Sequence, residues 1–105
     1  MRYDLTTVYD PRKSFYGKAV VEQIDNVSYL YSYGNKIAKI EVTPENKVNA
    51  YIFDLKNAYE ESLTFSKTSL RHLKEYLKQA GLKAGSKKQI LQDYLIVEVY
   101  KYDRI

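Results

Sequence analysis

Three turn signals, spaced about ten residues apart, divide the first half of the chain into segments of strand length. They are Asp25-Asn26, Gly34-Asn35 and Pro44-Glu45-Asn46, and their residue types are those preferred in tight turns. Asp25-Asn26 suits a type I′ hairpin turn, and Gly34-Asn35, with glycine first, suits type II′. Hairpin turns join antiparallel neighbours, so the spacing predicts an antiparallel β-meander.

The turns leave four predicted strands, at residues 17–24, 27–33, 36–43 and 47–55. In the second strand, Tyr29, Tyr31 and Tyr33 alternate with Ser28, Leu30 and Ser32, so the two sets point to opposite faces. Because two serines make their own face poorly apolar, we expect the tyrosine face to be the core face. A protein-contact surface and a platform on which nucleic-acid bases stack remain as alternatives.

The last third of the chain changes to a helical period. Between Ser66, a suitable N-cap, and Gly81, a suitable terminator, leucines fall at 70, 73 and 77, which places them on one helix face. Ser86 and Gln89 form a capping-box pattern that starts a short second helix. The segment Leu95–Tyr100 either returns to the sheet or extends that helix. Residues 63–65 are a candidate short strand before the main helix.

Taken together, these elements predict a single α+β domain over residues 1–105. Its antiparallel β-meander sheet carries one main helix packed on a face and a short second helix near the C-terminus. The sequence has no cysteine and no apolar run of membrane-spanning length, so we expect a cytoplasmic protein.

Composition argues against catalysis and against a cofactor. With no cysteine, one histidine and four glycines, the chain lacks a thiol nucleophile, a zinc motif and a phosphate-binding glycine loop. We expect His72 at the surface or at its boundary with the core, with Glu75 on an exposed flank of the same helix. Glu60 and Glu61 indicate a solvated acidic patch. The sequence therefore predicts a protein that is not an enzyme and that holds no cofactor or metal.

Positive charge is concentrated in one stretch of the chain. Residues 67–88 contain seven basic residues and one acidic residue, giving +6, whereas the whole chain carries +4. A solvated helix face, an acidic protein partner and nucleic acid can each account for this charge. The candidate binding residues are Arg71, Lys74, Lys78, Lys83, Lys87 and Lys88.

A loop at residues 9–17 has the composition of a recognition segment, because it mixes basic and aromatic residues. We predict that it binds a partner through five residues. The alternative is a structural lead-in in which Phe15 and Tyr16 plug one end of the core. The candidate partner-binding residues are Tyr9, Arg12, Lys13, Phe15 and Tyr16.

Three blocks, residues 9–19, 30–38 and 68–79, together resemble a family of small uncharacterised proteins encoded by phages and plasmids of Gram-positive bacteria. The first contains Tyr-Asp-Pro-Arg-Lys-Ser-Phe-Tyr-Gly-Lys-Ala, and the last Thr-Ser-Leu-Arg-His-Leu-Lys-Glu-Tyr-Leu-Lys-Gln. The resemblance implies a mobile-element origin and a compact cytosolic domain, and it transfers no catalytic residue. The acidic stretch 54–61 departs from the pattern.

The sequence thus leads to a hypothesis of function. We expect a small phage or mobile-element protein that acts non-catalytically by binding a host macromolecule, in the manner of an anti-CRISPR inhibitor of bacterial defence. In that setting Asp54, Glu60 and Glu61 would imitate phosphates. The alternative is an accessory protein that binds nucleic acid through the basic helix, and a weaker one is self-association through sheet edges.

Overall fold

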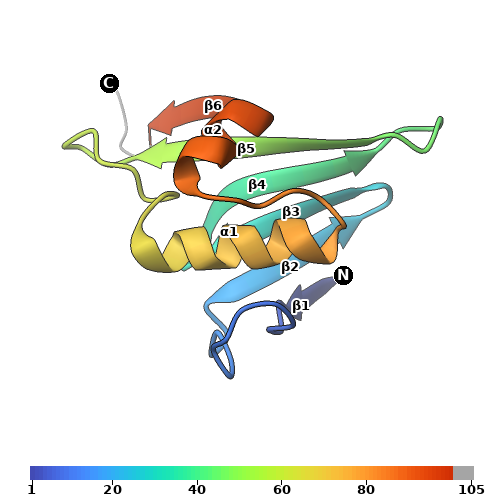
Figure 1. Ribbon diagram of the computed structural model, residues 1–105, viewed down its shortest axis with the longest axis horizontal. Helices are drawn as coiled ribbons and strands as arrows, with labels where there is room; N and C mark the ends of the chain where they lie inside the picture. Colours follow the sequence, from blue (N-terminus) through green and yellow to red (C-terminus); the bar gives the residue numbers. More distant parts are fainter. Residues whose placement is uncertain (101–105) are drawn as a thin grey trace.

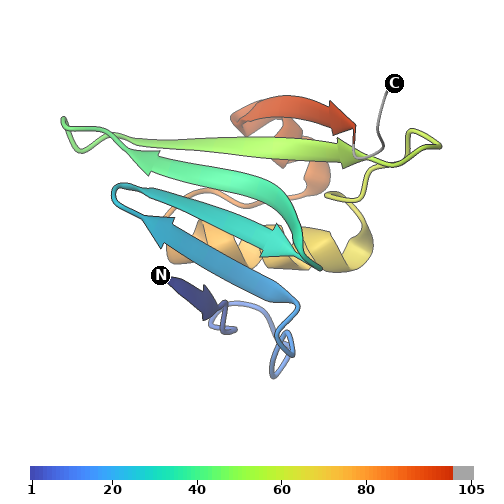
Figure 2. The ribbon, with the colours of Figure 1, turned by 180° about the vertical axis from the view of Figure 1, so that it is seen from behind.

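The computed structural model describes residues 1–100 and confirms the α+β fold, with a six-stranded sheet and two helices (Figure 1). The strands lie side by side in the order of the sequence, and both helices lie on one face of the sheet (Figure 2). The elements are β1 (Arg2–Asp4), β2 (Ala19–Ile24), β3 (Val27–Ser32), β4 (Asn35–Val42), β5 (Val48–Lys56), α1 (Lys67–Gln79), α2 (Lys87–Asp93) and β6 (Leu95–Tyr100).

The predicted meander is confirmed in β2 to β5, which pair antiparallel in sequence order. The two hairpin turns exchange the predicted types. In the first, Asp25 alone has a positive φ, 53°, which is the type II′ pattern. The second turn is Tyr33-Gly34, one residue earlier than predicted, and its φ values of 51° and 78° are the type I′ pattern.

Both edges of the sheet differ from the prediction of a purely antiparallel meander. The segment Leu95–Tyr100 is a strand, and it pairs parallel to β5 because α1 and α2 lie between the two strands in the sequence. On the other edge, the unpredicted β1 pairs with β2. Residues 63–65 form no strand, and Ser62 makes an isolated bridge to Lys56.

The main helix packs on the sheet through the predicted leucine stripe, with Leu73 and Leu77 fully buried and Leu70 at the margin. It ends in a Schellman motif, since the Leu82 N–H donates to the Leu77 carbonyl (2.9 Å) and Gly81 has a φ of 76°. Ser66 occupies the N-cap position, but its side chain donates to the Leu63 carbonyl instead of capping. The predicted capping box of α2 is confirmed.

The face of β3 that meets α1 is the opposite of the predicted one. Leu30 and Ser32 are buried beneath the helix at 0% and 1% exposure. Tyr29 and Tyr31 alternate with them and so point to the other face of the strand. No helix covers that face of the sheet (Figure 2). The expectation of a tyrosine core face was therefore wrong.

Ser32 is buried and Ser28 half-buried, and α1 supplies the hydrogen-bond partners of both. Ser28 Oγ lies 2.5 Å from the Tyr76 hydroxyl, and that hydroxyl also donates to the Ser28 carbonyl (3.0 Å). Ser32 Oγ lies 2.9 Å from Ser69 Oγ and 2.7 Å from His72 Nδ1. When its hydrogen bonds are satisfied, a hydroxyl can leave water at little cost in free energy.

In residues 1–100 no helix is long and apolar enough to cross a membrane.

Candidate functional site

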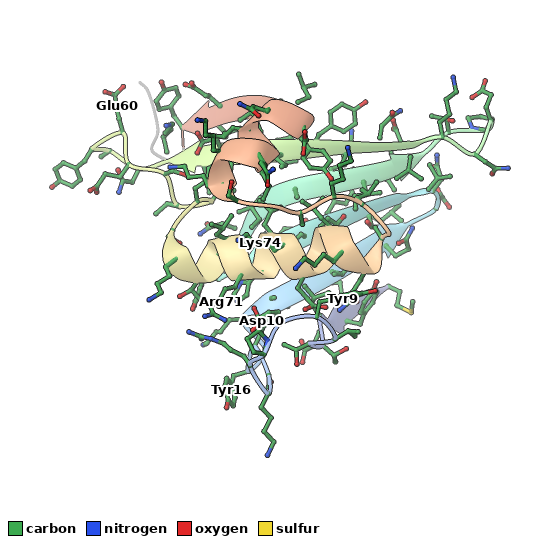
Figure 3. All side chains as sticks on the ribbon, viewed as in Figure 1. Tyr9, Asp10, Tyr16, Glu60, Arg71 and Lys74 are labelled. Atoms are coloured by element: carbon green, nitrogen blue, oxygen red, sulfur yellow. The ribbon has the colours of Figure 1, made fainter. Side chains whose placement is uncertain are left out.

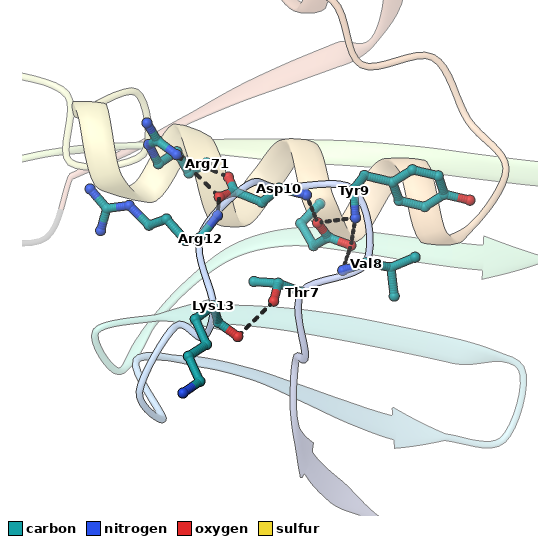
Figure 4. Close-up of polar contacts among 8 residues, drawn as sticks. Thr7, Val8, Tyr9, Asp10, Arg12, Lys13 and Arg71 are labelled. Atoms are coloured by element: carbon teal, nitrogen blue, oxygen red, sulfur yellow. Dashed lines mark hydrogen bonds and ion pairs between the residues drawn. The ribbon is translucent and has the colours of Figure 1, made fainter.

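The 9–17 loop is fastened to α1 by the carboxylate of Glu75. Its oxygens accept hydrogen bonds from the backbone N–H groups of Val8 (3.0 Å), Tyr9 (3.0 Å) and Asp10 (2.7 Å) (Figure 4). Glu75 is 1% exposed, so the predicted exposed flank was wrong. Gln79 Nε2 donates both to this carboxylate (2.5 Å) and to the Thr6 carbonyl (2.6 Å). One buried carboxylate therefore orders the whole entry to the loop.

The same contacts determine the protonation of Glu75. Burial by itself would raise its pKa, because it disfavours the charged form. The hydrogen bonds from Gln79 and from the Asp10, Val8 and Tyr9 amides outweigh burial and lower the pKa below its ordinary value. The carboxylate is thus ionised at neutral pH, in the form that accepts these bonds.

A second fastening joins Asp10 to Arg71. Arg71 Nη1 lies 3.1 Å from Asp10 Oδ1 and 3.3 Å from Oδ2 (Figure 4). Asp10 Oδ1 also accepts the backbone N–H of Arg12 (2.8 Å), which shapes the turn after Pro11. Thr7 Oγ1 donates to the Lys13 carbonyl (3.0 Å) and closes the loop upon itself. The loop and the helix flank therefore form one surface.

The predicted partner-binding residues of the loop separate into two groups. Tyr9, Arg12, Lys13 and Tyr16 are exposed, and Figure 3 shows Tyr16 at the tip that projects away from α1. Phe15 is only 4% exposed, so the partner-binding prediction is wrong for it. The core-plug alternative holds for Phe15 and is wrong for Tyr16, which is 77% exposed.

A groove of about 370 Å³ lies between the loop and α1. One wall contains Tyr9, and the other contains a basic stripe spaced four, three and four residues apart along the helix. The stripe is Lys67, Arg71, Lys74 and Lys78. We call the exposed residues Tyr9, Arg12, Lys13 and Tyr16, together with this stripe, the loop–helix surface.

Three further predicted lysines, Lys83, Lys87 and Lys88, are exposed and lie on the segment after α1 and on α2, on the same side of the sheet as the loop–helix surface (Figure 1). Lys87 Nζ sits 5.6 Å from the centre of the Phe65 ring. Of the seven basic residues between 67 and 88, Arg71 alone makes an ion pair within residues 1–100. Six lysines on this side therefore have no ion-pair partner within residues 1–100.

His72 is buried in the interior, contrary to the expectation of a surface or boundary position. It is 1% exposed, and its ring packs 4.5 Å from the Phe15 ring and 5.6 Å from the Tyr33 ring, measured between centroids. Burial and then the nearby charge of Arg12 lower its pKa to about 4, so the ring is neutral at pH 7. Its Ser32 partner is 1% exposed, so this serine–histidine contact joins β3 to α1 where no substrate reaches it.

Asp54 does not join Glu60 and Glu61, which are both exposed, in one acidic patch. Asp54 is 8% exposed, accepts from Ser62 Oγ (2.6 Å) and lies 3.3 Å from Lys56 Nζ. It is therefore not part of an exposed phosphate-like surface. Glu60 lies on the turn beyond β5, far from Tyr9 and Tyr16 (Figure 3). In the described part of the chain, no group of three metal-ligating side chains comes together.

Sequence reasoning missed the two acidic residues that build the site, Asp10 and Glu75. The sequence did contain one indication of the role of Glu75, because it is the one acidic residue within the basic stretch 67–88. A lone acid in a basic helix suggests a dedicated partner, but that partner is backbone more than sixty residues away.

The chain belongs to the family of unknown function DUF8033, whose model matches residues 3–92. The matched range includes the 9–17 loop, Glu75 and the whole basic stripe, so both halves of the loop–helix surface lie inside it. No curated protein and no solved structure matches the chain.

Proposed function

We propose that this member of the family is a non-catalytic binding protein that docks on an acidic surface of another protein. The observation that carries the proposal is that the fold brings the two predicted binding sites, the 9–17 loop and the basic helix, side by side. The aromatic and basic 9–17 loop is clamped to a basic helix flank, and six lysines on the same side have no ion-pair partner within residues 1–100. The resemblance to phage and plasmid proteins suggests a bacterial defence complex as the target and the cytoplasm as the place of action.

Charge and composition divide the work of binding between the two halves of the surface. Lysines that form no ion pair raise the association rate with an acidic partner and contribute less to the lifetime of the complex. Aromatic and arginine side chains supply most hot spots in protein interfaces. Tyr9 is 57% exposed and Tyr16 77% exposed, and Arg12 lies between them in the chain. The loop would therefore supply specificity and the stripe would supply attraction.

Preorganisation supports binding rather than a merely solvated surface. A free loop must be ordered when it binds, and each ordered residue costs entropy at that moment. In this chain Glu75, Arg71 and Gln79 hold the loop in place before any partner arrives. The entropy of ordering the loop is therefore lost on folding and not on binding, which favours binding.

A second candidate function, binding of nucleic acid, is favoured by the geometry of the stripe. Its four basic residues extend over about 16 Å of helix, since the rise is about 1.5 Å per residue. A phosphate backbone would contact such a row, and each contact adds about 0.9 to the slope of log affinity against log salt. The exposed tyrosines of the loop favour the protein partner.

The first experiment is capture of partners from a Gram-positive bacterial lysate, with the wild type beside two matched variants. Lys74→Glu reverses a charge of the stripe, and Lys47→Glu makes the same change at an exposed turn outside the loop–helix surface. We expect a specific protein to be retained by the wild type and Lys47→Glu and lost with Lys74→Glu. Equal recovery by the two variants, or recovery of no specific protein, would overturn the proposal.

The second experiment separates the two candidate functions. Fluorescence anisotropy with random-sequence DNA and RNA, at about 50 mM and about 200 mM salt, measures the phosphate contribution directly. Tight binding that weakens steeply with salt and is lost in Lys74→Glu would assign the stripe to nucleic acid. Absence of binding at the lower salt leaves the protein partner as the function.

A further inference from the structure

The face of the sheet opposite the helices is uncovered by any element of residues 1–100 (Figure 2). Strand register places an aromatic and aliphatic surface on it, in contrast to the basic helical side. Leu95 is 60% exposed and Val97 38% exposed. We call this the open face, and its apolar members include Val20, Tyr29, Tyr31, Tyr51, Phe53, Leu95 and Val97.

Cations already lie over the three tyrosine rings of the open face. Lys36 Nζ lies 4.4 Å from the centre of the Tyr29 ring, and Lys39 Nζ lies 5.0 Å from that of Tyr51. On Tyr31 the guanidinium of Arg2 sits 4.7 Å away. A nucleic-acid base would need these ring faces for stacking. The arrangement therefore disfavours the stacking platform and favours a partner that contacts ring edges and lysine stems.

The charges of the open face are balanced, unlike those of the helical side. Register places three basic residues and three acidic residues on its strands, namely Arg2, Lys36 and Lys39 with Asp4, Glu22 and Glu41. A two-fold dimer brings the same patch of both copies together, so the patch must complement itself. Equal numbers of both signs permit that, whereas two copies of the helical side would repel each other.

We propose that the open face binds a second copy of this chain, as a face-to-face sandwich of the two sheets. Packed sheets lie about 10 Å apart with strands about 30° from parallel. Six strands about 4.8 Å apart and about six residues long give a flat face of about 500 Å². Two such faces bury about 1,000 Å², the lower limit of a specific interface. The dimer is therefore weak and forms as concentration rises.

The test measures mass against concentration for the full chain and two matched valine variants. Val97→Glu places a carboxylate on the open face, and Val42→Glu places one at a valine of almost equal exposure, 39%, on the other face of the sheet. Because both valines are partly exposed strand residues, circular dichroism and a thermal melt confirm that each variant folds. Sedimentation or light scattering then follows the mass from about 10 µM to about 1 mM, the weak end of the affinity scale.

We expect the wild type and Val42→Glu to move from 12.3 kDa toward twice that mass, and Val97→Glu to stay at the monomer mass. A wild type that stays monomeric throughout would overturn the proposal. In that case, shifts of the Tyr29 and Tyr51 amide signals on adding oligothymidine would assign the face to single-stranded nucleic acid. Equal dimerisation of both variants would assign the contact to a sheet edge and also overturn it.

The proposal is independent of the docking function, because the two use opposite sides of the sheet. Lys74→Glu is therefore expected to dimerise like the wild type even where it loses its partner. Salt also distinguishes the dimer from the partner complex. Screening weakens docking on an acidic partner, but it does not weaken the burial of an apolar face. A dimer that dissociates as steeply with salt as the partner complex would contradict the apolar contact.

Discussion

Replacing Glu75 with glutamine tests whether one buried carboxylate orders the recognition loop. The carboxylate accepts three backbone N–H groups, from Val8, Tyr9 and Asp10. Glutamine is nearly the same size but has one acceptor oxygen, so at least one of the three N–H groups loses its partner. A hydrogen bond to a charged group contributes about 1.5–3 kcal/mol, and water reaches part of the loop, so we expect a loss of about 2–3 kcal/mol in loop stability.

Hydrogen exchange of the loop amides is the assay that reads this change locally. A loss of about 2–3 kcal/mol corresponds to exchange about 30- to 150-fold faster at Val8, Tyr9 and Asp10, because about 1.4 kcal/mol is a factor of ten. Amides in the middle of β3 and β4 should change far less. Glu45→Gln is the control, since it makes the same chemical change at an exposed turn residue. Unchanged exchange of the three loop amides in Glu75→Gln would refute the ordering of the loop by the Glu75 carboxylate.

The dependence of stability on acid pH tests the role of the Glu75 carboxylate independently. The folded-state pKa of Glu75 is lowered, so the unfolded chain takes up its proton at a higher pH than the folded chain does. The contribution of Glu75 to stability is therefore complete above the ordinary glutamate pKa and is lost as pH falls below it. Glu75→Gln should remove this part of the acid destabilisation, as followed by urea unfolding at several pH values.

Three further predictions concern the fold. The folded-state pKa of His72, about 4 against the ordinary 6.5, means that the unfolded chain binds a proton first. The free energy of unfolding should thus fall by roughly 3 kcal/mol from pH 6.5 to pH 4, at 1.36 kcal/mol per pKa unit. In His72→Gln, urea unfolding should show a much smaller fall over the same pH range. Leu73→Ala, at 0% exposure between α1 and the sheet, should cost about 2–5 kcal/mol of unfolding free energy, and a cost below about 1 kcal/mol would contradict its central packing. Gly34→Ala should cost about 1–2 kcal/mol through its φ of 78° alone, because a Cβ there meets nothing within 4 Å, and an unchanged melting temperature would contradict this.

Local chemistry explains what the sequence made predictable. Turn residues, the Ser86 capping box and the glycine that ends α1 all act within a few residues of their own position. They predicted the strands β2 to β5 and both helices to within two residues. Their exact turn types did not follow, because Tyr33 takes a left-handed conformation that tyrosine seldom adopts.

Burial of polar groups could not be predicted in the same way, since it depends on partners far along the chain. Ser32 looked unsuited to a core, yet its hydroxyl meets His72, forty residues later in the sequence. Glu75 looked exposed for the same reason, as its donors lie near residue 9. Each of these pairs makes burial acceptable for both members, so neither residue alone carries the signal. The wrong prediction for the core face of β3 and the missed role of Glu75 thus have the same cause, namely hydrogen-bond partners that lie far apart in the sequence.

The inversion of β3 also relates the two proposed interfaces to each other. Because the serines satisfy their hydrogen bonds against α1, the tyrosines are left on the open face, where cations and acids balance. The lysines of α1 and α2 in turn lie on the opposite side and form no ion pair within residues 1–100. A dimer formed through the open face would point its two basic sides outward. Two such sides engaging one acidic assembly would bind more tightly than either alone, because the second contact becomes intramolecular. Weak self-association and charge-driven docking would therefore reinforce each other, and Val97→Glu should weaken capture of a multisubunit partner without touching the loop–helix surface.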